Sequence, residues 1–362
     1  MVKVKVVRLP SRPSPRSSAR SSPRPGPRAG RVRSALAAAV LVVAAGTAGA
    51  LSGPAAVAAP AAPAADPDRT FRITDPRITE SSGLAASRAH PGVYWTHNDQ
   101  DKPLIYGIDS RTGETVATIT MRGVGEPRDM EAISVGADGD IYVGDIGDNL
   151  NGSWNHVWIY RFPEPKTLAD ATVDATQYTV KYADGPRDAE AMMVHPTTGL
   201  VYIASKNEDG GGLYEGPAEL SAGGTNTFTR VGEVPWVTDG AFSPDGKELV
   251  LRSYFSARGY VWKNGRLGAD HRVRAPIQGQ AESVTYTLDG SALMFGTEGT
   301  RSQVERVDIE KGGGSSSGAG SAGNGAAGDG AGGDGGNITI GAVVLVGAAV
   351  LFFGFRRRKQ GG

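Results

Sequence analysis

The chain has 362 residues, with 38 basic and 38 acidic side chains and no cysteine. Lack of cysteine excludes disulfides, thiol nucleophiles and thiolate metal sites. The charge is unevenly spread, because ten basic residues lie between Lys3 and Arg33 and four more at 356–359, which leaves 24 basic against 38 acidic residues elsewhere. A central part with a net charge of about −14 argues against nucleic acid as a partner and suits bound cations.

The N-terminal segment 1–58 has a basic leader and then an apolar run, ALAAAVLVVAAGTAGAL, at 35–51. Small residues follow this run, with Ala56-Val57-Ala58 as a cleavage site. This order predicts a secretory signal peptide, and a retained transmembrane helix is the alternative. The Ala/Pro-rich residues 59–68 are expected to form a linker.

The C-terminal part consists of a Gly-rich stretch at 312–337, an uncharged apolar run at 338–355 and a basic tail at 356–362. The first is typical of a flexible tether. The second is long enough to cross a bilayer as a helix, and the basic tail places its end in the cytoplasm. The sequence therefore predicts a single-pass type I protein of the cell membrane, with the body, 69–311, outside the cell.

The body contains a pattern that occurs twice, RDMEAISVGADGDIYVGD at 128–145 and RDAEAMMVHPTTGLVYIAS at 187–205. Each copy begins with Arg-Asp-x-Glu-Ala and continues with an apolar strand, a glycine-bearing turn and a second strand. Looser copies begin at Ser81, Val237 and Gln280. Internal similarity at intervals of roughly 40–60 residues is typical of a β-propeller.

Taken in chain order, each repeat is expected to supply four antiparallel strands, counted outward from the propeller axis. The innermost strands are expected at 82–86, 131–136, 190–194, 238–243 and 282–287. Asp-Gly turns are expected after three of them, at 138–139, 245–246 and 289–290.

The fifth repeat runs into the tether before a fourth strand. The segment TFRIT at 70–74 alternates like a strand, and we expect it to complete the last blade, because an open ring would leave sheet edges exposed. The sequence thus predicts an all-β, five-bladed propeller, and six blades stay open if a long connection holds another strand pair.

One polar position is in register when the innermost strands are aligned on their apolar residues. It is occupied by Ser82, Glu131, Glu190, Thr238 and Glu282. Because the innermost strands line the channel and blades repeat by rotation, these side chains should face a common centre. Three like charges repel unless they are neutralised, and Ca²⁺ accepts six to eight oxygens in flexible geometry. We therefore expect an axial Ca²⁺ site, with a water-filled polar channel as the alternative.

This ring is similar to that of the calcium-activated apyrases, secreted or membrane-anchored five-bladed nucleotidases that hold Ca²⁺ in the central channel with Ser and Glu from successive inner strands. The resemblance covers the innermost strands and the blade count, and the apyrases' nucleotide-contacting loops have no match here. Most of 70–310 also resembles secreted propeller proteins of high-GC bacteria, through its DIGDN segment at 145–149 and its repeat style.

A second set of polar residues is expected around the mouth of the channel, at strand ends and before the ring glutamates. It comprises His97, Asn98, Asp99, Arg128, Asp145, Asp148, Asn149 and Arg187. The arginines would grip a phosphate or carboxylate in a bidentate manner. The alternative is structural: the acidic residues form Asx turns, and each arginine pairs with a neighbouring aspartate to pin a connection between blades.

Two functions fit these patterns. The first is a monomeric binding or interaction module at the cell surface, with an extracellular ligand or protein as partner and an axial Ca²⁺. The second is a Ca²⁺-dependent hydrolase of phosphate-containing substrates, as the apyrase resemblance implies. No nucleophile–base pair stands out, and the five histidines form no HExxH motif. This favours the binding module, because a propeller fold carries no activity by itself.

Overall fold

The computed structural model describes residues 68–99, 102–150 and 152–310, and every regular element in these ranges is a β-strand. The predicted signal peptide, tether and membrane helix lie outside the described residues. Within the described ranges there is no helix that would cross a membrane.

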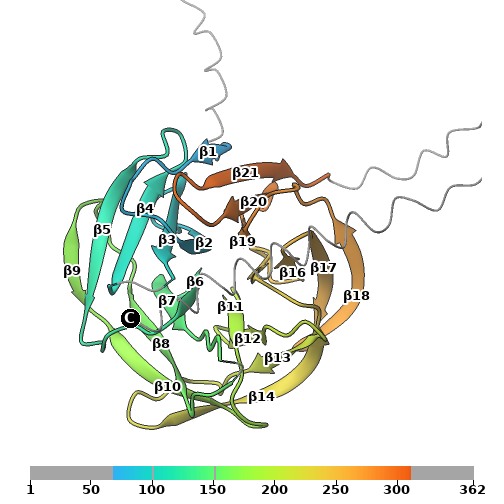
Figure 1. The fold of residues 1–362 in the computed structure, drawn as a ribbon. Helices are drawn as coiled ribbons and strands as arrows, with labels where there is room; N and C mark the ends of the chain where they lie inside the picture. The colour runs from blue at the N-terminus through green and yellow to red at the C-terminus, as the bar shows by residue number, and fades with distance from the viewer. Residues whose placement is uncertain (1–67, 100–101, 151, 311–362) are drawn as a thin grey trace, which may run out of the picture. The chain divides into compact units, whose positions relative to one another are not determined.

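The strands are arranged around a ring of innermost strands (Figure 1). These are β2 (Ser81–Ala86), β6 (Met130–Val135), β11 (Ala189–Val194), β15 (Asp239–Phe242) and β19 (Ala281–Tyr286). Each packs against the next in this order, and β19 packs against β2. The predicted innermost strands agree with these bounds to within one residue at each end, because apolar residues fill both faces of a strand that is buried on both sides.

Antiparallel strands lead outward from each innermost strand and form a propeller-like arrangement. The first run is β2, β3 (Val93–Asn98), β4 (Leu104–Asp109) and β5 (Thr115–Arg122), and the second is β6, β7 (Asp140–Asp145), β8 (Val157–Pro163) and β10 (Thr176–Tyr182). The third run is β11, β12 (Val201–Ser205), β13 (Gly211–Glu215) and β14 (Thr225–Val234), and the fourth is β15, β16 (Glu248–Ser253), β17 (Ser256–Lys263) and β18 (Arg266–Val273). The fifth run is β19, β20 (Ala292–Thr297), β21 (Gln303–Asp308) and β1 (Phe71–Arg72).

The last run is completed from the other end of the described chain. Strand β1 pairs antiparallel with β21, and Phe71 lies opposite Val304. The main chain after β1 continues this contact, since Ile73 donates its N–H to the carbonyl of Ser302 at 2.9 Å. The prediction that 70–74 supplies the outer strand of the last repeat is therefore confirmed.

Two peripheral pairings join neighbouring runs, and the sequence did not indicate either. Strand β10 pairs in parallel with β14, which merges two runs into one eight-stranded sheet, and β9 (Ala171–Asp174) pairs in parallel with β5. The β9 pairing is reinforced by an ion pair between Arg122 and Asp174 at 2.6 Å. Residues of β9 are largely exposed and carry no apolar alternation, so the pattern that revealed the other strands is missing there.

The predicted Asp-Gly turns are present and share one geometry. Gly139, Gly246 and Gly290 have φ values of 78°, 69° and 67°, the region that glycine adopts without strain. In each turn the preceding aspartate accepts the backbone N–H two residues further on. These side-chain contacts define the Asx type of turn.

Candidate functional site

The five predicted ring positions are all nearly inaccessible to solvent. Ser82, Glu131, Glu190, Thr238 and Glu282 are between 0% and 3% exposed. Ser82 and Glu131 are in direct contact, since the serine hydroxyl donates to Oε2 of Glu131 at 2.9 Å. Glu190 instead pairs with Lys206, and the hydroxyl of Thr238 has no hydrogen-bond partner among the described residues.

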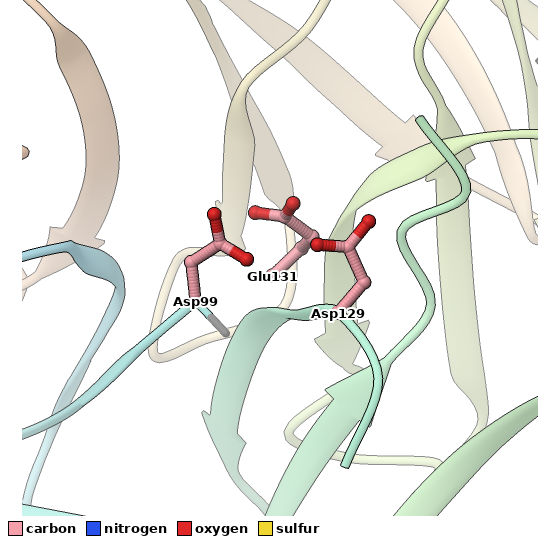
Figure 2. A group of neighbouring side chains, drawn as sticks. All are labelled: Asp99, Asp129 and Glu131. Carbon is pink, nitrogen blue, oxygen red and sulfur yellow. The ribbon is translucent and has the colours of Figure 1, made fainter. Parts of the chain in front are cut away.

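Three carboxylates converge beside the contact between Ser82 and Glu131. Asp99, Asp129 and Glu131 each offer an oxygen, and these oxygens lie within 4.8 Å of one another. Their exposures are only 3%, 2% and 1%. Figure 2 shows the three carboxylates turned toward one another from two different segments of chain. This cluster is the densest concentration of negative charge that the structure shows at the predicted ring.

Local backbone geometry brings the three residues together. Asp129 and Glu131 are two positions apart at the start of β6, where the pairing with β7 shifts register between Met130 and Ala132. Asp99 directly follows β3, and its carbonyl accepts the N–H of Met130 at 2.9 Å. The first two runs therefore meet at this point, where the end of β3 contributes Asp99 and the start of β6 contributes Asp129 and Glu131.

Neighbouring polar groups fix the orientation of two of these carboxylates. The side-chain amide of Asn149 donates to Oδ2 of Asp129 at 2.8 Å, and Ser82 donates to Glu131. Gly147 closes the same corner, because a Cβ there would lie 2.5 Å from Oδ2 of Asp129 and 2.9 Å from Cγ of Glu131. Only glycine lets this loop approach the carboxylates so closely.

A lysine occupies the other side of the ring. Lys206, which follows β12, is 7% exposed on its side chain and pairs with Oε1 of Glu190 at 2.5 Å. Burial opposes its charge, but Glu190, Tyr254 and Glu282 outweigh burial and hold the pKa of Lys206 well above its ordinary value. The chain thus supplies its own cation to Glu190 and Glu282, so the ring is divided into a lysine-neutralised half and a carboxylate-rich half.

Two of the predicted mouth aspartates hold loops in place. Asp145 accepts the backbone N–H groups of Arg128 and Asp129 and the hydroxyl of Tyr160. Asp148 accepts the hydroxyl of Ser153 at 3.0 Å and the N–H of Trp154 at 2.6 Å. For these two residues the structure shows the contacts of the structural alternative.

His97 and Asn98 are buried rather than exposed at a mouth. Burial lowers the pKa of His97 to about 4, so the imidazole is neutral near pH 7. The side chain of Asn98 accepts the N–H groups of Thr79 and Glu80 and donates to the carbonyl of Arg77. Asn98 thereby anchors the segment that leads into β2.

The two arginines of the repeated Arg-Asp pattern differ. Arg187 pairs with Asp184 at 2.6 Å, as the structural alternative expects. Arg128 instead lies between two indole rings, 4.1 Å from the centroid of Trp154 and 3.8 Å from that of Trp158. Such stacking suits the flat, weakly hydrated guanidinium.

Sequence reasoning missed two residues of this site, Asp129 and Lys206. The spacing Asp-x-Glu was visible in the sequence, but the register shift between Met130 and Ala132 that accompanies it was not. Lys206 follows the buried strand VYIAS directly, and a lysine at the end of such a strand indicates a nearby acid.

Comparison with known proteins gives no family for the chain. No family model matches it, and no curated protein matches it. Among solved structures, a gluconolactonase from Xanthomonas campestris is 14% identical with a TM-score of 0.42, over 70% of this chain and 90% of the other. A chain of a mitotic checkpoint complex is 16% identical with a TM-score of 0.35, over 62% and 60% of the two chains. Hydrazine synthase from Kuenenia stuttgartiensis is 12% identical with a TM-score of 0.36, over 60% and 61%. Likenesses of this size carry no argument about the site or its chemistry.

Proposed function

We propose that this protein is a binding module built on a five-bladed β-propeller and organised by a Ca²⁺ ion. The blade count rests on the five innermost strands, each of which heads a run of four. The proposal of a bound cation rests on one observation, the buried cluster of Asp99, Asp129 and Glu131.

The donor set suits a hard divalent cation. Three carboxylates so close together and so far from water repel one another strongly, and a divalent cation offsets that repulsion. Ca²⁺ accepts many oxygens in flexible geometry, whereas Mg²⁺ demands a near-ideal octahedron. Asp99, Asp129 and Glu131 would hold the ion, and Ser82 and Asn149 would orient two of the carboxylates.

The bound ion would supply positive charge where the first two runs meet. That charge would hold the loop after β3 against the start of β6 and so fix the rim of the channel for a partner.

The location of the protein in the cell is part of the same proposal. It rests on the signal-like segment at 1–58 and the apolar run at 338–355, which together suit a body held outside the cell membrane.

Thermal unfolding of the full-length protein in Ca²⁺ and in chelator tests the cation. We expect Ca²⁺ to raise Tm, because a ligand at about 100 times its Kd stabilises the folded state by about 2.7 kcal/mol. Asp129→Asn should weaken Ca²⁺ binding by roughly 10–100-fold or more. Asp174→Asn is the matched control, since its side chain is 76% exposed and pairs only with Arg122 among the described residues.

Equal Tm values in Ca²⁺ and chelator would contradict the proposal, as would unchanged Ca²⁺ affinity in Asp129→Asn. The hydrolase alternative is tested on the same samples with a panel of nucleoside diphosphates. Ca²⁺-dependent phosphate release that Glu131→Gln abolishes would replace the binding module by a hydrolase.

A further inference from the structure

A polar pocket of about 240 Å³ lies beside the third run, apart from the three-carboxylate cluster. Its lining combines three basic side chains, one acid, small polar residues and bare glycine backbone. The residues that carry the argument are Arg187, Asp188, Lys206, Gly211, Gly212 and Arg230. None of them belongs to the proposed Ca²⁺ site.

Two arginines of this pocket lie near Tyr214. The Arg187 guanidinium lies 4.7 Å from the ring centroid of Tyr214. A Cβ on Gly212 would be 2.8 Å from Nε of Arg230 and 2.9 Å from the hydroxyl oxygen of Tyr214, so both groups border the same glycine. Both arginines lower the pKa of Tyr214, although burial outweighs them and raises it. The positive charges of both arginines therefore act on the same phenol group.

Glycine allows close packing at the edge of the pocket. A Cβ on Gly211 would lie 2.0 Å from the carbonyl oxygen of Ser205, and one on Gly212 would lie 2.7 Å from the ring of Tyr214. Any side chain at 212 would also displace Arg230. Gly211 and Gly212 thus let β13 pack closely against Ser205, Tyr214 and Arg230 beside the pocket.

The existing contacts leave donors on both arginines. Arg187 uses Nε and Nη2 on Asp184 and the carbonyl of Gly185, and Arg230 uses Nε and Nη2 on backbone carbonyls. Nη1 of each forms no hydrogen bond with any residue that the structure describes. The acid in the lining, Asp188, accepts the N–H of Asp148 at 2.8 Å. A guanidinium presents paired donors that match two oxygens of a carboxylate or phosphate.

We propose that this pocket binds an oxyanion, namely the carboxylate or phosphate group of a ligand. Arg187 and Arg230 each offer the Nη1 group, which their existing contacts leave available. The site extends the proposed function, because it names the chemical class of a group that the module recognises and does not depend on Ca²⁺.

Calorimetric titration of the full-length protein with inorganic phosphate, and separately with acetate, tests this site. Chelator is present and ionic strength is held constant with chloride, so that failure of the Ca²⁺ proposal leaves this test intact. We expect saturable binding of at least one anion and a loss of at least roughly tenfold in affinity in Arg230→Gln. Arg230 is 41% exposed, so its replacement should leave folding unchanged.

Arg272→Gln, at an exposed position of β18, is the matched control and should bind as the wild type does. Gly212→Ala is a second variant and should weaken binding by displacing Arg230. Binding of phosphate alone assigns the site to phosphate groups, and binding of acetate assigns it to carboxylates. Absence of saturable binding for both anions, or an equal loss in Arg230→Gln and Arg272→Gln, would overturn the proposal.

Discussion

Lys206 decides how negative charge is distributed at the channel. Its ammonium pairs with Glu190 and lies near Glu282 and Tyr254, while the carboxylates of Asp99 and Glu131 gather at Asp129. Removing one partner of a buried ion pair destabilises a protein far more than replacing both partners by neutral groups does. The two halves of the ring should therefore respond differently to mutation.

Lys206→Met should reduce the free energy of unfolding by roughly 3–5 kcal/mol, because it leaves the carboxylate of Glu190 buried without its cation. The double variant Lys206→Met/Glu190→Gln should recover most of that loss. Denaturation by urea measures both. A double variant as unstable as the single one would show that the lysine acts through packing rather than through charge.

His195 provides a pH-dependent contribution away from the ring. Its Nδ1 accepts the N–H groups of Thr197 and Thr198, Nε2 lies 3.2 Å from the carbonyl of Gly246, and burial lowers its pKa. A base with a lowered folded pKa contributes stability that is present above about pH 6.5 and is lost as the pH falls through the folded pKa. Wild type should thus lose more stability than His195→Gln between about pH 8 and about pH 5. Equal losses in urea denaturation would contradict this account.

Single residues also show what the sequence could and could not predict. Glu131 was predicted as a Ca²⁺ ligand from the register of the innermost strands, and Asp99 was predicted at the channel mouth because it follows a strand end. The pairing of Glu190 with Lys206 was not predicted, since it depends on how a loop after one strand folds over the start of another. Side-chain partners of this kind are set by tertiary packing rather than by local pattern.

At the scale of elements, the closure between β1 and β21 depends on one tight approach. Gly113, in the turn between β4 and β5, has a φ of 75°, and a Cβ there would lie 1.9 Å from the carbonyl oxygen of Arg72. The backbone after β1 is therefore held against this turn. Repeat patterns predicted the closing strand, because a ring of paired strands leaves only one vacant edge.

Gly113→Ala should destabilise the protein more than Gly199→Ala does. Gly199 has a similar φ of 70° but no atom within 4 Å of its added Cβ, so it reports only the backbone strain of about 1–2 kcal/mol. The additional loss in the free energy of unfolding that Gly113→Ala causes, relative to Gly199→Ala, measures the contact with the closing strand. Equal changes in the free energy of unfolding would mean that this contact does not stabilise the ring.

The parallel pairings of β9 with β5 and of β10 with β14 could not be predicted from the sequence. Strand prediction relies on alternating apolar and polar residues, and β9 is too exposed to carry that signal. The first half of β14 does alternate, but alternation within one strand does not specify the strand beside it. The innermost strands are buried on both faces, so their apolar runs and turn residues were enough to locate them.

At the scale of the whole molecule, the described strands form a ring whose polar end gathers buried charge from three of its runs. Acids of the first two runs converge at Asp99, Asp129 and Glu131, and the third run adds the pair of Glu190 with Lys206. The oxyanion pocket next to Lys206 would place a second recognition element on this third run. A cation and an anion site in one ring would let the module select ligands by charge pattern.

Anomalous diffraction from crystals of the full-length protein grown in Ca²⁺ tests the central claim most directly. The account predicts one strong anomalous peak within coordination distance of carboxylate oxygens from Asp99, Asp129 and Glu131. A well-ordered cluster without a peak, or a peak only between Glu190 and Glu282, would contradict it.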